Sequence, residues 1–239
     1  DGKLFDSLEK LREILEDLPS VEKVILIPYT EDDFDTSNIS HAFYYEDFVD
    51  RNNYNSLVFD QLPFNHPLYI MYSSGTTGLP KSIVHSAGGT LIQHLKELKL
   101  HVDLNRDDTI FYFTTCGWMM WNWLVSSLAT GATVVLYDGS PLHPDSSAMW
   151  KLAQDLKITI FGTSAKFITA SEAAGERPKQ KFDLSKLRSI LSTGSPLVDE
   201  GFDYVYRDVK DDVLLASISG GTDLISCFAL GNPTLPVHR

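Results

Sequence analysis

Residues 158–174, ITIFGTSAKFITASEAA, place a short run of β-forming residues directly before a helical pattern. The same order recurs from residue 67 to residue 239. The runs typical of strands are LYIMYSS (68–74), KSIVHS (81–86), TIFYFTT (109–115), TVVLYD (133–138), ITIFGTS (158–164), LRSILST (187–193) and VLLASIS (213–219). The helical stretches lie near 87–100, 119–130, 145–157, 164–174 and 197–208. Strands separated by such helices imply parallel crossovers, so the sequence predicts an α/β fold with a mostly parallel sheet covered by helices.

The start of the chain predicts one helix followed by one strand. Leucine and isoleucine recur at helical spacing through residues 4–18, with Asp6 and Glu9 placed as a cap pair and Pro19 after the last turn. The apolar run VILI at 24–27 is short and continuous, which favours a buried strand.

An acidic connection is expected to follow. Residues 30–66 are rich in acidic and turn-forming residues, and HAFYYEDFVDRN at 41–52 could form one amphipathic helix. Residues 1–66 contain 15 acidic and 5 basic residues, a net charge of −10 out of −12 for the whole chain. We interpret this segment as a solvated surface and expect a boundary between 1–66 and 67–239.

Composition excludes several classes of protein. The chain has 239 residues, 20 Lys plus Arg and 32 Asp plus Glu, so it lacks the basic surface of a nucleic-acid-binding protein. No apolar run approaches the ~20 residues that span a bilayer, and no signal peptide is visible. Cys116 and Cys227 are too few and too far apart for a disulfide framework or a cysteine-type zinc site, which fits a cytosolic location.

The densest cluster of flexible and polar residues lies between two predicted strands, as Tyr72-Ser73-Ser74-Gly75-Thr76-Thr77-Gly78-Leu79-Pro80-Lys81-Ser82. Gly75 and Gly78 permit positive φ and a close backbone approach, hydroxyl and backbone N–H groups are donors, and Lys81 adds a positive charge. This combination favours polyphosphate binding, with an ordinary surface turn as the alternative. The loop is not a Walker A motif, because Pro80 stands where that motif needs glycine.

The full string resembles the phosphate-binding signature of the adenylate-forming superfamily, which contains acyl-CoA synthetases, luciferases and the adenylation domains of peptide synthetases. Four further strings narrow the resemblance to the ligases of acetoacetate and CoA: KSIVHSAGGTLIQHLKE (81–97), CGWMMWNWLVSSLATGATVVLYDGSP (116–141), LSTGSPL (191–197) and SISGGTD (217–223). The resemblance implies part of the large N-terminal domain of such an enzyme, with ATP, Mg²⁺ and CoA as cofactors or co-substrates. It implies that ATP activates acetoacetate to acetoacetyl-AMP, and that CoA then displaces AMP.

The resemblance also implies roles for individual residues. Lys81, Thr222 and Asp223 would be catalytic, with Asp223 toward Mg²⁺, which prefers oxygen ligands. Relatives mostly carry glutamate at that place, so the shorter Asp223 could act through water; its alternative role is to cap a following helix. The residues implied to bind the nucleotide are Ser73, Ser74, Gly75, Thr76, Thr77, Gly78, Lys81, Gly194, Ser195, Pro196, Ser217, Ile218, Ser219, Gly220, Gly221 and Thr222.

Two of these segments follow predicted strands, where α/β folds bind ligands. By resemblance, the adenine would lie between residues 194–196 and residues 217–221. The alternative for 194–196 is a simple turn in which Ser195 or Pro196 begins a helix.

The acyl pocket is implied at residues 116–121, with Trp118, Met119, Met120 and Gly220 toward the substrate. Glycine at 220 stands where acetate-activating relatives carry tryptophan, which would lengthen the pocket; the alternative is a turn that needs positive φ. We expect Trp121 and Trp123 in the core. His85, His94 and His101 lack the spacing of metal ligands, and no GxSxG hydrolase motif occurs.

Complete members of the superfamily are longer. By resemblance, we expect this chain to be a piece without the small C-terminal domain and without the start of the large domain, which agrees with its lack of an initiator methionine. We expect such a piece to be poorly soluble or to self-associate, and to show little or no catalysis alone. Two other functions stay open: a non-catalytic nucleotide-binding module, and an adenylation domain for another small carboxylic acid.

Overall fold

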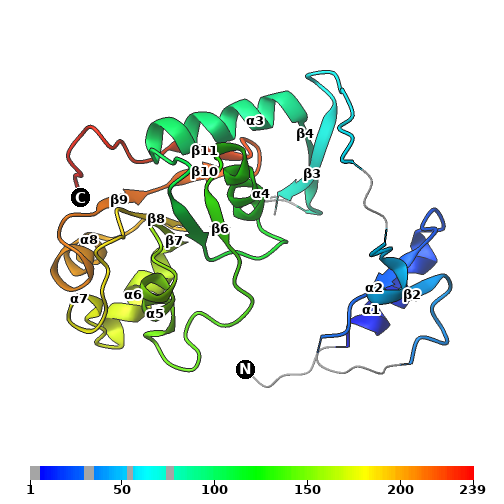
Figure 1. The fold of residues 1–239 in the computed structure, drawn as a ribbon, viewed down its shortest axis with the longest axis horizontal. Helices are drawn as coiled ribbons and strands as arrows, with labels where there is room; N and C mark the ends of the chain where they lie inside the picture. The colour runs from blue at the N-terminus through cyan, green and yellow to red at the C-terminus, as the bar shows by residue number, and fades with distance from the viewer. Residues whose placement is uncertain (1–5, 30–34, 53–55, 74–77) are drawn as a thin grey trace. The chain divides into compact units, whose positions relative to one another are not determined.

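Figure 1 shows the computed structural model of the chain, which describes residues 6–29, 35–52, 56–73 and 78–239. Its internal contacts divide the chain into two units, residues 1–61 and residues 62–239. Each unit has its own strands and its own buried apolar core.

The first unit begins with the predicted helix, confirmed as α1, Ser7–Asp17. Asp6 caps it, because its carboxylate accepts hydrogen bonds from the backbone N–H groups of Leu8 at 2.8 Å and Glu9 at 3.3 Å. The apolar side of α1 packs on a small core. Its side chains are Val24, Leu26 and Ile39, with Leu8, Leu11, Leu15 and Ala42 against them.

The predicted strand near residue 25 is confirmed as β1, Val24–Leu26. The helix expected over 41–52 is wrong: this stretch forms strand β2, Ala42–Tyr44, and the short helix α2, Tyr45–Phe48. β2 pairs with β1 in parallel. The pairing gives β1 the backbone partners that a buried strand requires, which outweighs the helical spacing of the sequence.

The second unit begins with a hairpin of β3, Pro67–Ser73, and β4, Lys81–Ser86. Both strands were predicted, but as members of the parallel sheet. They pair with each other in antiparallel register and form a separate two-stranded sheet. The connection over residues 74–80 is too short for the crossover of a dozen or more residues that parallel strands need.

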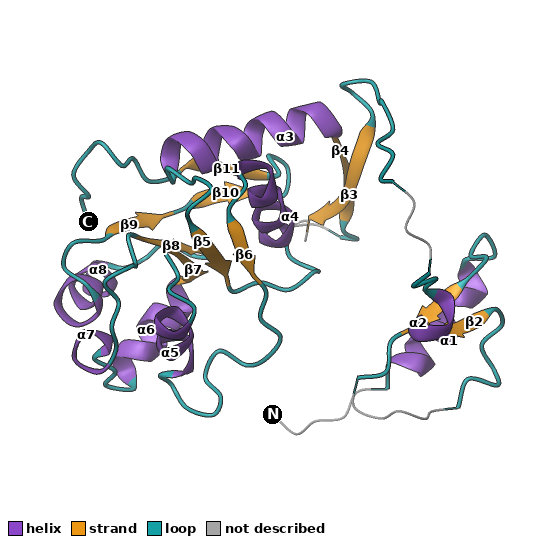
Figure 2. Cartoon of the chain, viewed as in Figure 1, coloured by secondary structure: helices purple, strands orange, loops and turns teal. Residues whose placement is uncertain are grey.

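The predicted parallel sheet is confirmed by five strands in the order β6-β5-β7-β8-β9, all parallel. Their bounds are β5 Thr109–Tyr112, β6 Thr133–Val135, β7 Ile160–Ser164, β8 Ser189–Thr193 and β9 Leu214–Ser217. Figure 2 shows helices on both sides of these strands. The carboxyl ends of the strands therefore meet at one edge of a sheet that is covered on both faces.

The helices match the predicted stretches, apart from the additional short helix α7. They are α3 Ala87–Lys96, α4 Met119–Ser126, α5 Ala148–Asp155, α6 Ala165–Ala173, α7 Pro178–Lys181 and α8 Asp199–Tyr204. Turns of other helix type extend three of them: a π-helix Glu97–His101 after α3, a 3₁₀-helix Ser127–Thr130 after α4 and a π-helix Val205–Val209 after α8.

Alternate residues of the strands enter two separate cores, one on each face of the sheet. Phe111, Phe161 and Leu215 lie in the core that contains residues of α5, α6 and α8. Tyr112 and Leu191 lie in the core that contains residues of α4 and the π-helix after α3. This alternation follows from the two-residue period of a strand.

The last predicted strand, 213–219, is shorter than expected. β9 ends at Ser217, and a second hairpin follows, formed by β10, Ser219–Gly221, and β11, Ser226–Ala229. β10 and β11 pair in antiparallel register across a turn at residues 222–225. This turn contains Thr222 and Asp223, two of the predicted catalytic residues.

Within the described ranges, none of the helices combines the length and the apolar character that a membrane span requires.

Candidate functional site

A cavity of about 340 Å³ lies beyond the carboxyl ends of β8 and β9. Its lining contains twelve of the predicted site residues, from three separate segments: Trp118, Met119, Met120, Gly194, Ser195, Pro196, Ser217, Ile218, Ser219, Gly220, Gly221 and Thr222. Glu97, Trp123, Thr193, Ser226, Cys227 and Leu230 complete the lining. The fold thus brings the implied nucleotide and acyl segments to one cavity.

The ends of β8 and β9 are joined by hydrogen bonds. The Thr193 hydroxyl donates to the carbonyl of Ile218 at 3.1 Å, and the N–H of Ile218 donates to the carbonyl of Ser192 at 2.7 Å. Gly194 has a φ of +89°, a conformation that favours glycine and turns the chain sharply after β8. The alternative in which Ser195 or Pro196 begins a helix is wrong, because α8 begins at Asp199.

At Gly220 the two hairpin strands approach so closely that no side chain fits. A Cβ atom placed on it would lie 2.0 Å from the Ser226 carbonyl oxygen and 2.5 Å from the Cys227 Cα. Gly220 is not among the glycines with positive φ, so the expected reason for a glycine turn does not apply. The pairing of β10 with β11 therefore explains why glycine stands at position 220, independently of the length of the cavity.

The implied acyl segment lies at the start of α4. Met120 is buried, whereas Trp118 and Met119 are half-buried and pack against the same core. The core prediction for Trp123 is confirmed, since this side chain is 1% exposed. The prediction for Trp121 is wrong, because it is half-buried and lies outside both main cores.

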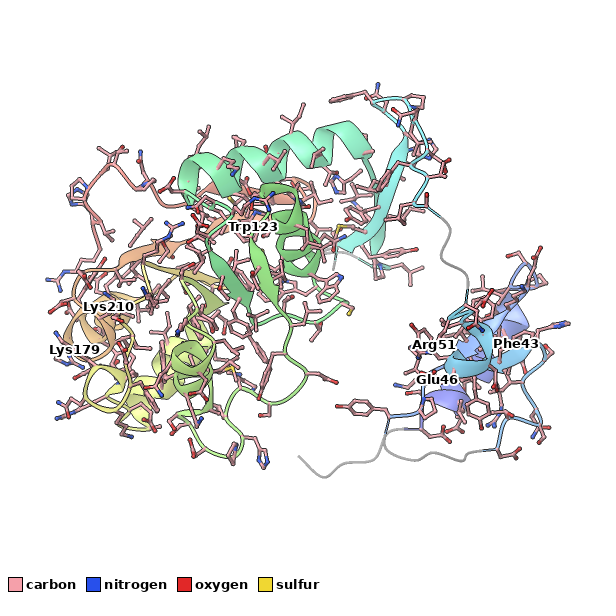
Figure 3. All side chains as sticks on the ribbon, viewed as in Figure 1. Phe43, Glu46, Arg51, Trp123, Lys179 and Lys210 are labelled. Carbon is pink, nitrogen blue, oxygen red and sulfur yellow. The ribbon has the colours of Figure 1, made fainter. Side chains whose placement is uncertain are left out.

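The floor of the cavity contains a buried carboxylate that the sequence analysis did not single out. Glu97 is 1% exposed and accepts hydrogen bonds from the Trp123 indole at 2.9 Å and the Gln93 amide at 2.8 Å. The Ser226 hydroxyl donates to the same carboxylate, so α3, α4 and β11 meet at this group. Figure 3 shows Trp123 on α4, beneath α3.

A second buried network lies beside Glu97. His94, 0% exposed, donates from Nε2 to the carbonyl of Ile225 at 2.7 Å, and its Nδ1 lies 2.8 Å from the Ser126 hydroxyl. Burial lowers the pKa of His94, and the Glu97 carboxylate opposes this shift. Burial likewise raises the pKa of Cys227 to about 12, with Glu97 adding to the shift, so Cys227 stays a thiol at neutral pH.

These polar residues had a signal in the sequence. Thr90, His94 and Glu97 are spaced by four and three residues, the spacing of one helix face, and all three are buried. A polar stripe on the buried face of a helix requires partners, which the β10–β11 hairpin supplies to His94 and Glu97.

The predicted phosphate loop is described only at its ends. Residues 74–77, which include Ser74, Gly75, Thr76 and Thr77, lie outside the described residues. Ser73 pairs with Lys81 across β3 and β4. Gly78 has a φ of +154°, in agreement with the expectation that glycine at this position permits a positive φ. Ser73, Gly78 and Lys81 are not part of the cavity lining.

Thr222 and Asp223 lie in the turn between β10 and β11. The carbonyl of Thr222 accepts a 2.7 Å hydrogen bond from Nε2 of His85, a residue of β4. Asp223 is exposed. Its alternative role as a helix cap is wrong, because β11 follows the turn rather than a helix.

The described residues contain no group of three or more His, Cys, Asp or Glu side chains placed to hold a metal ion. Mg²⁺ usually keeps several waters and uses one or two carboxylates together with substrate phosphates. An exposed carboxylate beside the cavity, as in Asp223, fits that requirement. Cys116 and Cys227 are both free.

The family model described as AMP-binding enzyme matches residues 3–231. The chain is 53% identical over 245 residues to the acetoacetyl-CoA synthetase of Danio rerio, covering 100% of this chain and 36% of that protein. It is 51% identical over 240 residues to the acetoacetyl-coenzyme A synthetase of Rhizobium meliloti (strain 1021), covering 100% of this chain and 37% of that protein. The solved structure of the acetoacetyl-CoA synthetase from Streptomyces lividans has a TM-score of 0.88 and 44% identity, covering 99% of this chain and 36% of that one. The chain thus spans little more than a third of these relatives.

Proposed function

Because this chain belongs to the AMP-binding enzyme family, we propose that its protein is a ligase that activates acetoacetate with ATP and transfers the acyl group to CoA. The carrying observation is the cavity at the ends of β8 and β9, which joins the implied nucleotide and acyl segments. Identity of 53% across the whole chain to an acetoacetyl-CoA synthetase supports the choice of acid. The cytosolic location stays a prediction.

The proposed nucleotide site uses the two strand-end segments. Residues 194–196 and 217–221 form walls of the same cavity. The hydrogen bonds of Ile218 with Thr193 and with Ser192 fix their separation. A flat adenine ring fits between backbone walls of this kind, at the edge where α/β sheets bind ligands.

The proposed phosphate site uses the loop between β3 and β4. Ser73, Ser74, Gly75, Thr76, Thr77 and Gly78 would supply hydroxyl and N–H donors, and Lys81 a positive charge. Thr222 would contact a phosphate and Asp223 would hold Mg²⁺, which supplies charge neutralisation when bound. Lys81 and Asp223 then lie on two different hairpins, which a hydrogen bond from His85 to the Thr222 carbonyl connects.

In the proposed first step, a carboxylate oxygen of acetoacetate attacks the α-phosphorus of ATP, and the bond from that phosphorus to the β-phosphate oxygen breaks. Pyrophosphate leaves and acetoacetyl-AMP forms. Lys81 offsets the charge that develops on the leaving phosphates, while the cavity positions the attacking oxygen.

In the second step, the thiol sulfur of CoA attacks the acyl carbonyl of acetoacetyl-AMP and its proton passes to solvent. The carbon–oxygen bond to AMP breaks, and acetoacetyl-CoA and AMP leave. Trp118, Met119, Met120 and Gly220 would surround the acyl group, since they share the cavity with the nucleotide walls. Their apolar surface favours burial of the carbon chain over water.

Residues 1–66 and 67–239 would both belong to the large AMP-binding domain of the enzyme. The relatives are nearly three times longer than this chain, so the proposal extends to the whole protein. We propose that a small C-terminal domain contributes to CoA transfer, and that this chain alone turns over slowly or not at all.

Exchange of labelled pyrophosphate into ATP, measured on the full-length protein, tests the proposal. Acetoacetate should support exchange at least tenfold faster than acetate, butyrate or an amino acid panel. Fast exchange with another acid would identify an adenylation domain for that acid. ATP binding without exchange on any acid would identify a non-catalytic nucleotide-binding module.

A further inference from the structure

We propose that His85 is a positioning residue that holds the turn bearing Thr222 and Asp223 in register with the strand bearing Lys81. The inference rests on the proposed function, because it assigns His85 to the same ATP site. His85 touches no substrate in this account. It acts through the backbone of Thr222.

The bond that carries the inference joins His85 Nε2 to the Thr222 carbonyl oxygen at 2.7 Å. A carbonyl oxygen only accepts, so Nε2 carries the proton and donates. The two residues are 137 positions apart in sequence. His85 lies on β4, and Thr222 lies in the turn between β10 and β11, which form a different two-stranded sheet. No strand pairing among the described residues connects these sheets, so side-chain contacts set their relative position.

Lys81 and His85 lie on the same face of β4, because side chains separated by an even number of residues share a face. Their partners across the hairpin are Ser73 and Tyr69. On this face Ile83 and His85 are half-buried, whereas Ser82 and Val84 on the other face are exposed. The face is therefore turned toward the body of the unit at Ile83 and His85, and Lys81 at its end is exposed.

The acceptor is well placed to orient Asp223. The Thr222 carbonyl and the Asp223 N–H belong to one planar peptide group, so a bond to that oxygen fixes the plane from which the Asp223 side chain begins. The same carbonyl accepts from the N–H of Ile225 at 3.2 Å, which closes the turn. His85 therefore adds the only described bond from the β3–β4 hairpin to a residue of this turn.

Two neighbouring donors hold the adjacent part of the same hairpin. His94 donates to the Ile225 carbonyl at 2.7 Å and Gln93 to the Cys227 carbonyl at 3.3 Å. Both lie on α3, which follows β4 directly. They hold the last residue of the turn and the second residue of β11, and His85 holds the first residue of the turn, next to Asp223.

The test uses three variants of the full-length protein. His85→Leu removes the donor, and His85→Asn keeps polarity on a side chain too short to reach. His85→Gln can place its amide nitrogen near the position of Nε2 and keeps the donor. His101→Leu is the matched control, because His101 also bonds a backbone carbonyl, that of Gly231 at 3.0 Å, outside the proposed site.

We expect His85→Leu and His85→Asn to lower kcat for acetoacetate-dependent pyrophosphate exchange about 10-fold to 100-fold, the usual effect of a misplaced catalytic group. The Mg²⁺ concentration for half-maximal rate should rise severalfold, while KM for acetoacetate stays within twofold. His85→Gln should restore most of the rate. His101→Leu should match wild type in both quantities.

Isothermal titration of ATP at low and high Mg²⁺ keeps the inference separate from the proposed function. If wild type binds ATP but activates no acid, the proposed function fails. A weaker ATP affinity of His85→Asn that is confined to low Mg²⁺ would then still support the inference about His85.

If wild type is active, an unchanged rate and an unchanged Mg²⁺ requirement in His85→Asn overturn the inference about His85. An equal loss of exchange rate in His85→Gln and His85→Asn also overturns it. If wild type is inactive, an ATP affinity of His85→Asn equal to that of wild type at low Mg²⁺ overturns it as well. If wild type binds no ATP, both proposals fail. Should His85→Leu fail to fold, His85→Asn alone decides the outcome.

Discussion

The indole N–H of Trp123 donates a 2.9 Å hydrogen bond to the buried carboxylate of Glu97, at the floor of the cavity. Gln93 and Ser226 donate to the same group, so three segments of the chain depend on one charge. Removing one partner of such a network leaves buried donors without an acceptor.

Glu97→Ala should therefore lower the free energy of unfolding of the full-length protein by about 3–5 kcal/mol. Glu97→Gln should cost less, since its amide oxygen still accepts from Trp123 and the Gln93 amide can reorient. Urea unfolding followed by tryptophan fluorescence measures both. Glu46→Ala, which breaks an exposed pair with Arg51 (Figure 3), is the control and should leave the midpoint unchanged.

Lys81→Ala should weaken ATP binding about 10-fold to 100-fold, the worth of one charge-assisted bond to phosphate. The thermal midpoint should stay the same because Lys81 is exposed. Titration calorimetry with ATP measures the loss. Lys179→Ala removes an exposed lysine paired with Asp211 on the other side of the sheet and should bind ATP as wild type does; equal loss in both variants would point to general charge rather than a phosphate contact.

Asp223→Asn should raise the Mg²⁺ concentration needed for half-maximal pyrophosphate exchange at least tenfold, because an amide keeps the shape but loses the charge that attracts a hard cation. Stability should not change, since no helix depends on Asp223 as a cap. An exchange rate equal to that of wild type at limiting Mg²⁺ would remove Asp223 from the metal site.

Gly220→Ala should reduce activity with acetoacetate and with acetate to the same degree, because the new Cβ meets the Ser226 carbonyl rather than the acyl group. A tryptophan at this position would meet the same backbone, so it cannot report on the length of the pocket alone.

Met119→Ala tests the length of the acyl pocket more directly. It should improve the ratio of kcat/KM for a longer acid over acetoacetate, since about 0.8 kcal/mol accompanies each additional buried CH₂.

Stability should fall in mild acid because of His94. Burial holds its pKa below the ordinary value of 6.5, although the hydrogen bond to the Ile225 carbonyl and the charge of Glu97 oppose this shift. The unfolded chain therefore takes up a proton before the folded chain does, so the free energy of unfolding declines as pH drops below about 6.5 until the folded pKa is passed. Urea midpoints at pH 8, 7, 6 and 5.5 measure this slope, which His94→Gln should lose and His101→Gln should keep.

The sequence was sufficient to predict the parallel sheet, because the strands β5 to β9 are apolar runs separated by long helical patterns. The resemblance to the adenylate-forming superfamily also implied twelve residues that line the cavity. For two of the three segments, 194–196 and 217–222, a position after predicted strands agreed with that implication. β3 and β4 were placed wrongly because two apolar runs look alike in sequence whether they pair with the sheet or with each other. Only the length of the connection over 74–80 distinguishes the two cases.

The contacts of His85, His94 and Glu97 could not be predicted in the same way. Each of them has a partner in the β10–β11 hairpin that lies 129 to 137 positions away. Two of these three partners are backbone carbonyls, which any sequence supplies. Gly220 illustrates a further limit, because glycine serves equally well for a long pocket and for two strands in close contact.

The most direct test of the proposed reaction follows one oxygen atom. The full-length protein is incubated with ATP, CoA and acetoacetate labelled with ¹⁸O in its carboxylate, and AMP is analysed by mass spectrometry. Formation of acetoacetyl-AMP predicts one ¹⁸O atom in each AMP, alongside acetoacetyl-CoA. Label in inorganic phosphate together with ADP, or AMP without label, would contradict the account.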